Sequence, residues 1–272
     1  MRDINFSIKD KVAVITGAGG IICGTMAKVM AQHGAKVAVL DKMLPAAEAI
    51  AQEINAAGGE AIAVEADVLS KESLEEARAA VVAKFGKVDI LINGAGGNKK
   101  DATTSPERDF FHMDLAAFKW VFDLNVTGAV LTTMVFGELF AQQKAGNVIN
   151  IASMATYHPL TNTVAYCGAK SAVANFTEWM ATHFNQNYST NIRVNAIAPG
   201  FLLTNQNRFL MQKEDGSPTP RGERVLAKTP MGRYGDPEEM AGPVIWLCSD
   251  AASFVNGAVI PIDGGFSAFW GI

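Results

Sequence analysis

Short apolar runs alternate along the chain with longer stretches in which apolar residues recur at helical spacing. Most of the short runs are rich in Val and Ile and have the length of a buried β-strand. The predicted strands are 12–16, 36–40, 60–65, 88–92, 147–152, 192–197 and 258–262. The predicted helices between them are 22–33, 44–57, 71–85, 114–142, 164–187 and 237–249.

Nearly continuous apolar strands joined by helices predict a parallel sheet that is covered on both faces. No repeat or linker interrupts the pattern, so we expect residues 1–272 to form one α/β domain. The expected architecture is a Rossmann fold, a doubly wound parallel sheet of about seven strands with helices on both faces. Two segments, 94–113 and 200–235, fit no element, and loops of this length are usually functional. We expect 200–235 to be a mobile lid over the substrate.

Composition narrows the classes of partner. The net charge is −4 and no run of Lys or Arg exceeds two residues, so nucleic-acid binding is disfavoured. The longest stretch without charged residues, 145–169, contains Gly, Asn, Pro and hydroxyl residues, which predicts no membrane span. The N-terminal residues lack the apolar core of a signal peptide, and the three cysteines leave an odd count, which together favour the cytoplasm. The four histidines show no ligand spacing, so no metal site is predicted.

A glycine-rich turn, TGAGGIICG (16–24), lies between the first predicted strand and the first predicted helix. Its spacing fits neither common dinucleotide motif, because Ile21, Ile22 and Cys23 stand at positions where one or the other requires glycine. Even so, ligands of doubly wound sheets bind beyond the carboxyl ends of the strands, and a helix N-terminus favours phosphate. The turn is therefore predicted to hold a dinucleotide pyrophosphate, with a plain strand-to-helix turn as the alternative. The glycines that would allow close approach or tight helix packing are Gly17, Gly19, Gly20 and Gly24.

Two acidic residues end the next two predicted strands. Asp41 closes KVAVLD, where an acid typically binds the adenosine ribose of NAD and repels the 2′-phosphate of NADP. Lys42 beside it could offset that repulsion. Asp67, in VEADV, could face the adenine. For both acids the alternative is a helix cap, a common role of aspartate.

Tyr166 and Lys170, in YCGAK, are four residues apart and therefore lie on one face of the predicted helix 164–187. Ser153 ends the fifth predicted strand, so the edge of the sheet can bring the three side chains together. A protonated lysine near a phenol stabilises the phenolate, which predicts a lowered tyrosine pKa and an acid or base that works near neutral pH. Tyrosine–lysine pairs at this spacing also occur by chance, but Ser153 and Asn125 support the catalytic interpretation.

Five motifs then occur in order: NGAG (93–96), Ser153, YCGAK (166–170), RVNAIAPG (193–200) and IPIDGGF (260–266). Together they resemble the short-chain dehydrogenase/reductase family over essentially the whole chain. The resemblance implies an oxidoreductase that interconverts a secondary alcohol and a ketone with NAD, and less readily with NADP. It also implies that Ile21 and Cys23 occupy positions where most members carry glycine.

The resemblance assigns roles to individual residues. It implies that Tyr166 is the general acid/base, that Lys170 binds the nicotinamide ribose, and that Ser153 positions the substrate carbonyl. Asn125 would hold a water in a proton relay, while Asn93 would brace the central strands. The implied cofactor contacts are Gly17, Gly19, Gly20, Ile22, Asp41, Asp67, Val68, Asn93, Gly94, Ala95, Tyr166, Lys170, Pro199, Gly200 and Thr204, the last of these near the carboxamide.

The altered turn also resembles that of a branch of the family that acts on sugar acids, the D-mannonate oxidoreductases. TPRG (219–222), TPMGRYGDPEEM (229–240) and the final GGFSAFWGI are similar too. This resemblance favours D-mannonate and D-fructuronate as the substrate pair. The alternatives are another polyol, keto acid or small ketone, or a cofactor-binding protein without catalysis.

A sugar acid carries a carboxylate, which a guanidinium matches with two parallel hydrogen bonds. Arg208 and Arg221 follow the strand end that the family uses for substrate, so we expect one of them to bind the carboxylate. Ordinary solvated loop charges are the alternative. The reserve cations are Lys99 and Lys100, and the candidate partners of the hydroxyls are Asn98, Gln206 and Asn207.

The long predicted helix 114–142 has apolar residues on more than one side. Its apolar positions include Phe118, Val121, Phe122, Val126 and Val130. We therefore expect a homo-oligomer, and the family resemblance implies a tetramer. A fully buried core helix is the alternative explanation for the same pattern.

Overall fold

The computed structural model describes residues 4–204 and 207–271, in which seven strands form one parallel sheet with the order β3-β2-β1-β4-β5-β6-β7. The order reverses between β1 and β4, as in a doubly wound sheet. The strands are β1 (Val12–Thr16), β2 (Lys36–Asp41), β3 (Glu60–Glu65), β4 (Ile90–Asn93), β5 (Gly146–Ile151), β6 (Ile192–Pro199) and β7 (Val259–Ile262). The predicted Rossmann fold is confirmed, and most strand ends lie within one or two residues of the predicted ones.

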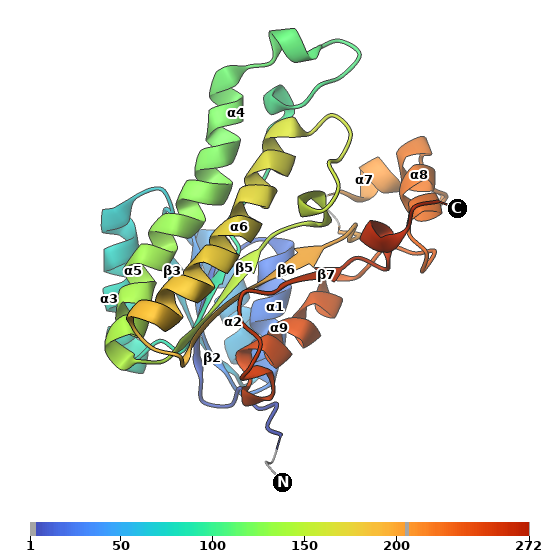
Figure 1. Ribbon diagram of the computed structural model, residues 1–272. Helices are drawn as coiled ribbons and strands as arrows, with labels where there is room; N and C mark the ends of the chain where they lie inside the picture. Colours follow the sequence, from blue (N-terminus) through green and yellow to red (C-terminus); the bar gives the residue numbers. More distant parts are fainter. Residues whose placement is uncertain (1–3, 205–206, 272) are drawn as a thin grey trace.

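Helices cover both faces of the sheet (Figure 1). One face is buried by α1 (Ile21–Gln32), α2 (Leu44–Ala56) and α9 (Ala241–Cys248). The other face is buried by α3 (Lys71–Phe85), α5 (Gly128–Gln143) and α6 (Val164–Asn187). Successive residues of β1 therefore enter opposite cores, which is why its first four residues are all apolar. Short 3₁₀ helices occur at Lys100–Ala102, Phe110–His112, Met154–Thr156, Pro237–Met240, Asp250–Ala252 and Phe266–Ala268.

The predicted helix 114–142 consists of three consecutive pieces. These are α4 (Leu115–Phe122), a π-helical turn at Asp123–Thr127 and α5. By length and composition the continuous 29-residue helix could cross a membrane, but half of its most apolar window is buried inside the protein. α5 packs against the sheet and α4 packs against α6, so core packing accounts for much of its apolar character.

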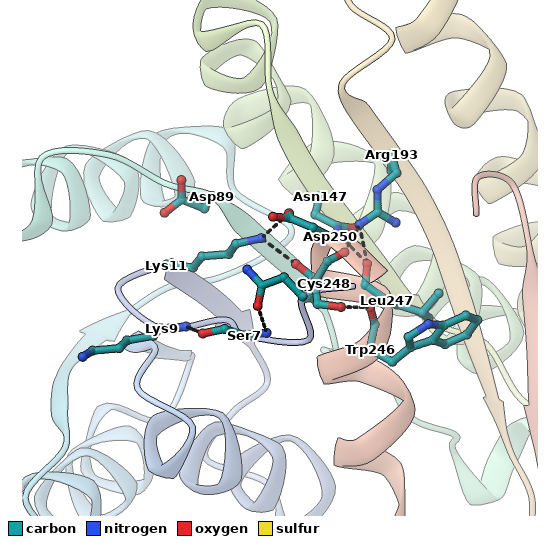
Figure 2. Close-up of polar contacts among 12 residues, drawn as sticks. Ser7, Lys9, Lys11, Asp89, Asn147, Arg193, Trp246, Leu247, Cys248 and Asp250 are labelled. Atoms are coloured by element: carbon teal, nitrogen blue, oxygen red, sulfur yellow. Dashed lines mark hydrogen bonds and ion pairs between the residues drawn. The ribbon is translucent and has the colours of Figure 1, made fainter. Parts of the chain in front are cut away.

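The amino-terminal edge of the sheet is closed by a polar cluster around the end of α9 (Figure 2). Lys11 Nζ donates to the carbonyl oxygen of Cys248 at 2.9 Å, and Asn147 Nδ2 donates to that of Leu247 at 2.8 Å. The Arg193 guanidinium donates to the carbonyls of Leu247 and Ser249. These cations and amides satisfy the free carbonyl groups at the helix C-terminus. The cluster thus fixes α9 at the edge opposite to the predicted site.

The segment 200–235 contains two short helices, α7 (Arg208–Met211) and α8 (Pro220–Lys228). Both stand out from the sheet beside the C-terminal end of the chain (Figure 1). The Tyr234 hydroxyl donates to the carbonyl of Met211, and Leu203 N donates to the carbonyl of Gly235. Hydrogen bonds therefore join the two ends of this segment and tie the end of α7 to the residues after α8. The function of the segment as a lid remains a prediction.

Candidate active site

Four side chains with catalytic chemistry come from three neighbouring elements. Ser153 follows β5, Tyr166 and Lys170 lie in the first two turns of α6, and Asn125 lies in the π-helical turn. Lys170 Nζ lies 5.6 Å from the centroid of the Tyr166 ring and donates to the carbonyl of Ile151 at 2.8 Å. Ser153 and Lys170 are 6% exposed and Asn125 is 2% exposed, whereas Tyr166 is half-buried. The structure thus brings the predicted group together.

Glycine at position 96 allows Asn125 and Lys170 to approach the same stretch of backbone. A Cβ atom on Gly96 would lie 2.7 Å from Asn125 Oδ1 and 3.3 Å from Lys170 Nζ. The Asn125 amide donates to the carbonyls of Gly97 and Val121, both at 2.7 Å, and accepts from Gly97 N at 3.2 Å. The π-helical turn therefore fixes the loop that follows β4 against the end of α4. Such turns are frequent at functional sites.

The predicted lowering of the Tyr166 pKa by Lys170 is wrong. Burial raises the pKa of the Tyr166 phenol above its ordinary value, and a hydrogen bond with the Ser153 hydroxyl offsets this only in part. Burial also lowers the pKa of Lys170 to about 8, because the charged ammonium is removed from water. A lysine that is partly neutral near pH 8 contributes less positive charge to the phenol.

The glycine turn after β1 is joined to the loop after β4. Thr16 Oγ1 accepts hydrogen bonds from Gly94 N at 3.1 Å and Ala95 N at 3.2 Å. Gly17 has φ +65°, and a Cβ atom there would lie 2.8 Å from Ala95 Cα. A side chain at position 17 would therefore separate the two loops. This close approach explains why glycine is needed at that position.

A cavity of about 380 Å³ lies at the carboxyl edge of the sheet, at the reversal of strand order. The predicted cofactor residues that line it are Gly17, Gly20, Ile22, Gly94, Gly200 and Thr204. Sequence reasoning did not assign to the cofactor the other lining residues, Ile21, Cys23, Gly96, Phe201, Leu202 and Asn207. The position of Phe201 and Leu202 directly after Pro199–Gly200 is the signal that could have identified those two.

The α1 N-terminus faces this cavity without a side-chain cap. Gly20 is the N-cap residue, no acidic residue lies in the first turn, and Ile21 and Cys23 line the cavity. The backbone N–H groups and the positive end of the helix remain available to a phosphate. Gly24 has its predicted packing role, because a Cβ atom there would lie 2.9 Å from Ile50 Cδ1. The redistributed glycines therefore leave the helix end open to the cavity, and pyrophosphate binding there remains a prediction.

Asp41 and Asp67 differ in their surroundings. Asp41 Oδ2 accepts from Gly19 N at 3.0 Å, which places the carboxylate directly beside the glycine turn, and Oδ1 accepts from Met43 N. Asp67 pairs with Lys42 at 2.7 Å, and this hydrogen bond lowers the pKa of Asp67. The alternative in which Asp67 caps α3 is wrong, because Ser70 is the N-cap residue.

Other predicted cofactor residues are buried in the structure that surrounds the site. Asn93 is 6% exposed, and its amide donates to Thr133 and Asn150, so it braces β4 against β5 as expected. Val68 is buried against Gly128, where an added Cβ atom would lie 2.8 Å from it. Pro199 ends β6 and is buried.

Asn207, a predicted partner of the substrate hydroxyls, lines the cavity, whereas Arg208, Arg221 and Asn98 lie outside it. Arg208 is exposed, and its guanidinium donates to Gln212 within the same short segment. Arg221 is exposed in the first turn of α8. Asn98 is also exposed and donates to Thr103 Oγ1 at 3.2 Å. Their contacts with substrate remain predictions, and Gln206 lies outside the described residues.

An aromatic wall that the sequence did not predict lies beside Tyr166. The rings of Phe201 and Phe266 are 5.2 Å apart, and both pack in a cluster that includes the Tyr166 ring. A histidine outside the predicted site holds the C-terminal segment here, since His158 Nε2 is 2.9 Å from the carbonyl oxygen of Ser267. The His158 ring is half-buried and contacts Trp270 edge-on.

No group of three or more His, Cys, Asp or Glu side chains could hold a metal ion within residues 4–204 and 207–271. The polar side chains brought together at this edge are a phenol, an amine, a hydroxyl and an amide.

Comparison with known proteins gives a consistent result. A family model described as enoyl-(acyl carrier protein) reductase matches residues 17–267. An uncharacterized oxidoreductase of Bacillus subtilis, UxuB, is 45% identical, with 100% of each chain covered. A crystal structure from Haemophilus influenzae with bound NAD, provisionally named a D-mannonate oxidoreductase, is 44% identical, with a TM-score of 0.92 and 98% of each chain covered. The 7alpha-hydroxysteroid dehydrogenase of Escherichia coli is 34% identical, with 96% of each chain covered.

Proposed function

Because the chain belongs to the short-chain dehydrogenase/reductase family, we propose that it is an NAD(H)-dependent oxidoreductase that interconverts D-mannonate and D-fructuronate, or a closely related sugar acid pair. The observation that carries the proposal is the meeting of Ser153, Tyr166, Lys170 and Asn125 beside the cavity at the carboxyl edge of the sheet.

NADH supplies a hydride to the substrate carbonyl carbon when bound, and NAD accepts it in the reverse reaction. The Tyr166 phenol gives its proton to the carbonyl oxygen during reduction and takes it back during oxidation. The Ser153 hydroxyl, already hydrogen-bonded to the phenol, holds the same oxygen. Lys170, whose Nζ lies 5.6 Å from the centroid of the Tyr166 ring, and Asn125 would restore the proton to the phenol.

The cofactor preference follows from charge near the glycine turn. The Asp41 carboxylate accepts from Gly19 N and would face the adenosine ribose, where a 2′-phosphate would be repelled. Lys42 could counter this repulsion, but it is engaged by Asp67 at 2.7 Å. The NAD bound in the Haemophilus structure supports the same preference. The kcat/KM for NADH should therefore exceed that for NADPH.

The comparisons bear on the substrate class as well as on the reaction. The similar Haemophilus protein is provisionally named for D-mannonate, which supports a sugar acid. A relative named for a hydroxysteroid is 34% identical to this chain, so family membership is compatible with other secondary alcohols as substrates. The aromatic wall of Phe201 and Phe266 favours a substrate with one apolar face. Another polyol, keto acid or small ketone is the alternative.

We also propose that the protein works as a homo-oligomer, a tetramer, in the cytoplasm. An apolar groove of about 940 Å³ lies along α5 and α6, with Met134, Trp179 and Tyr188 exposed on it. A second copy of the same face would remove these side chains from water.

The deciding experiment measures NADH oxidation with D-fructuronate beside a panel of neutral ketoses, 2-keto acids and 7-oxosteroids. The proposal predicts the highest kcat/KM for the sugar acid. A clear preference for a steroid or an uncharged ketose would reject the substrate but retain the reaction. The absence of NADH oxidation with every member of the panel, in protein that binds NADH, would favour a binding protein without catalysis.

A further inference from the structure

Beneath the catalytic group lies a buried chain of hydrogen bonds between four amide and hydroxyl side chains. Asn93 Nδ2 donates to Thr133 Oγ1 at 2.9 Å and to Asn150 Oδ1 at 2.8 Å. Asn150 Nδ2 donates to Thr177 Oγ1 at 2.8 Å, and that hydroxyl donates to the carbonyl of Val173 at 2.8 Å. All four side chains are 6% exposed or less. The chain runs from α5 across β4 and β5 to α6.

We propose that Asn150 and Thr177 are positioning residues for catalysis, because this chain fixes the catalytic helix α6 relative to the strands that carry the serine and the cofactor loop. The inference rests on the proposed function, since it assumes that Tyr166 and Lys170 act on the substrate.

On the α6 side, the hydrogen-bonded chain of side chains is attached two helical turns after Lys170. Thr177 follows Lys170 by seven residues in α6, which places both on the same face of the helix about 10 Å apart. Thr133 lies in α5, eight residues after Asn125 of the π-helical turn. Each functional residue is therefore followed along the chain by a hydrogen bond to the sheet.

On the strand side, the chain is attached close to the functional loops. Asn93 is the last residue of β4 and directly precedes Gly94, which lines the cofactor cavity. Asn150 precedes Ser153 by three residues, and it pairs with Asn93 in the register of the sheet. A shift of α6 against β5 would therefore change the position of the Tyr166 phenol relative to the Ser153 hydroxyl.

If packing alone were required, apolar side chains would fill this part of the core with a lower free-energy cost than these hydrogen-bonded side chains. Asn93 Oδ1 is buried and accepts no hydrogen bond from any residue in the described part of the chain. A buried polar atom without a partner destabilises the folded protein, whereas apolar residues of the same shape would avoid that cost. Directional hydrogen bonds, unlike apolar contacts, define one relative position of the elements that they join. The residue types thus fit positioning better than packing.

The test uses Thr177→Val, which removes the hydroxyl and keeps the branched shape. A misplacement of about 1 Å can cost about 100-fold in rate, and we expect a smaller loss in kcat, about 10-fold. NADH affinity should change less than about twofold, and Thr177→Ser, which retains the hydroxyl, should restore kcat. The matched control is Thr132→Val on α5. Thr132 is equally buried, but its hydroxyl donates only to the carbonyl of Gly128 in its own helix, at 2.7 Å.

A kinetic isotope effect separates positioning from a loss of folded protein. With NADH deuterated at the transferred position, Thr177→Val should raise the isotope effect on kcat, because hydride transfer becomes slower than product release. A reduced fraction of folded enzyme would lower kcat without changing the isotope effect. That result, or equal losses in Thr177→Val and Thr132→Val, would overturn the proposal.

Hydrogen exchange of residues 164–173 in the NADH complex gives a readout that needs no substrate. Exchange there should be faster in Thr177→Val than in wild type or Thr132→Val, and Thr177→Ser should restore it. Unchanged exchange would overturn the positioning role. If wild type reduces no sugar acid, the proposed substrate fails, and the kinetic comparison is made with whichever ketone of the panel is reduced. If no ketone is reduced, the proposed activity fails. Hydrogen exchange still decides whether the buried hydrogen-bonded side chains hold α6 in place.

Discussion

Burial of Cys23 reverses the pKa shift that its position at a helix N-terminus predicts. A helix N-terminus normally lowers a thiol pKa, but burial raises the pKa of Cys23 to about 12. The thiol is 5% exposed and packs against Gly94, where any side chain would collide with the sulfur. Cys23 is therefore a small packing residue between the two loops of the cofactor cavity, as the sequence favoured.

At the same scale, Tyr166→Phe should reduce kcat by about 10²–10⁴-fold, the usual cost of losing a positioned acid or base. NADH affinity should stay within about twofold of wild type, because the ring is retained. Steady-state kinetics and fluorescence titration with NADH measure the two effects. The control is Tyr157→Phe, whose hydroxyl donates to the carbonyl of Val259 at 2.6 Å. Retention of more than half of the wild-type kcat in Tyr166→Phe would remove the phenol from the mechanism.

Lys170 predicts a pH dependence of cofactor binding. Its pKa is lowered by burial to about 8, so the ammonium is present below that pH and is lost as the pH rises through it. If the ammonium binds the nicotinamide ribose, the Kd for NADH should rise between pH 7 and pH 9. Calorimetric titration across this range measures the change. Lys170→Met should bind NADH more weakly at pH 7 and show no inflection near pH 8, and an inflection retained in that variant would assign it to another group.

The lowered pKa of Lys170 also affects the free energy of unfolding, with a pH dependence opposite to that of cofactor binding. The unfolded chain binds a proton at Lys170 up to about pH 10.4, whereas the cofactor-free folded chain releases it near pH 8. Between these values the unfolded state binds more protons, so the Lys170 contribution to the free energy of unfolding rises with pH. Cofactor binding and folding therefore favour opposite protonation states of this one side chain.

At the scale of elements, the short helices of segment 200–235 carry the predicted carboxylate contacts. If Arg208 or Arg221 binds the substrate carboxylate, its replacement by alanine should raise KM for the sugar acid by about 10- to 100-fold, the range of a lost charged hydrogen bond. NADH affinity should not change, and an uncharged ketose of the same length should be affected far less. Kinetics on the acid and the ketose measure the difference.

The control for this pair is Lys213→Ala, which removes another exposed cation from the turn between α7 and α8. Equal losses on the acid and the ketose, or no loss on either, would mean that the carboxylate is held elsewhere. The exposure of both arginines in the cofactor-free structure is compatible with either result.

At the scale of the whole molecule, the apolar positions that suggested an oligomer prove to be largely internal. Val121 is fully buried, and Phe118, Phe122 and Val126 pack against α6 or its neighbours. The exposed apolar side chains are others, Met134 at 59% and Trp179 at 55%, on the outer surfaces of α5 and α6. Of the five predicted positions Val130 lines the groove along α5 and α6, so the case for self-association rests mainly on a surface that periodicity in one helix did not identify.

We expect Trp179→Glu to dissociate the oligomer, because a charge would be buried between two copies of the groove along α5 and α6. Sedimentation velocity at micromolar concentration should show a smaller species than wild type. Phe111→Glu, which places the same charge at an 88% exposed residue of the loop 94–113, should leave the assembly intact. A monomeric wild-type protein at that concentration would refute self-association.

Much of this molecule could be read from sequence because the information is local. Short continuous apolar runs rich in Val and Ile indicate strands buried on both faces, so the parallel sheet and the covering helices follow from pattern alone. The spacing of Tyr166 and Lys170 puts them on one helical face, and Ser153 and the glycine turn end strands whose carboxyl ends share an edge. These features depend on the period of helices and strands and on strand direction.

Three features were decided only by the tertiary structure, because each depends on groups far apart in the chain. Burial sets the pKa values of Tyr166, Lys170 and Cys23, and no local pattern gives the depth of a side chain. The wall of Phe201 and Phe266 and the buried chain through Asn93, Asn150 and Thr177 join elements that only packing brings together. The sequence thus determined which groups are present and at which edge, and long-range packing determined their ionisation and their distances.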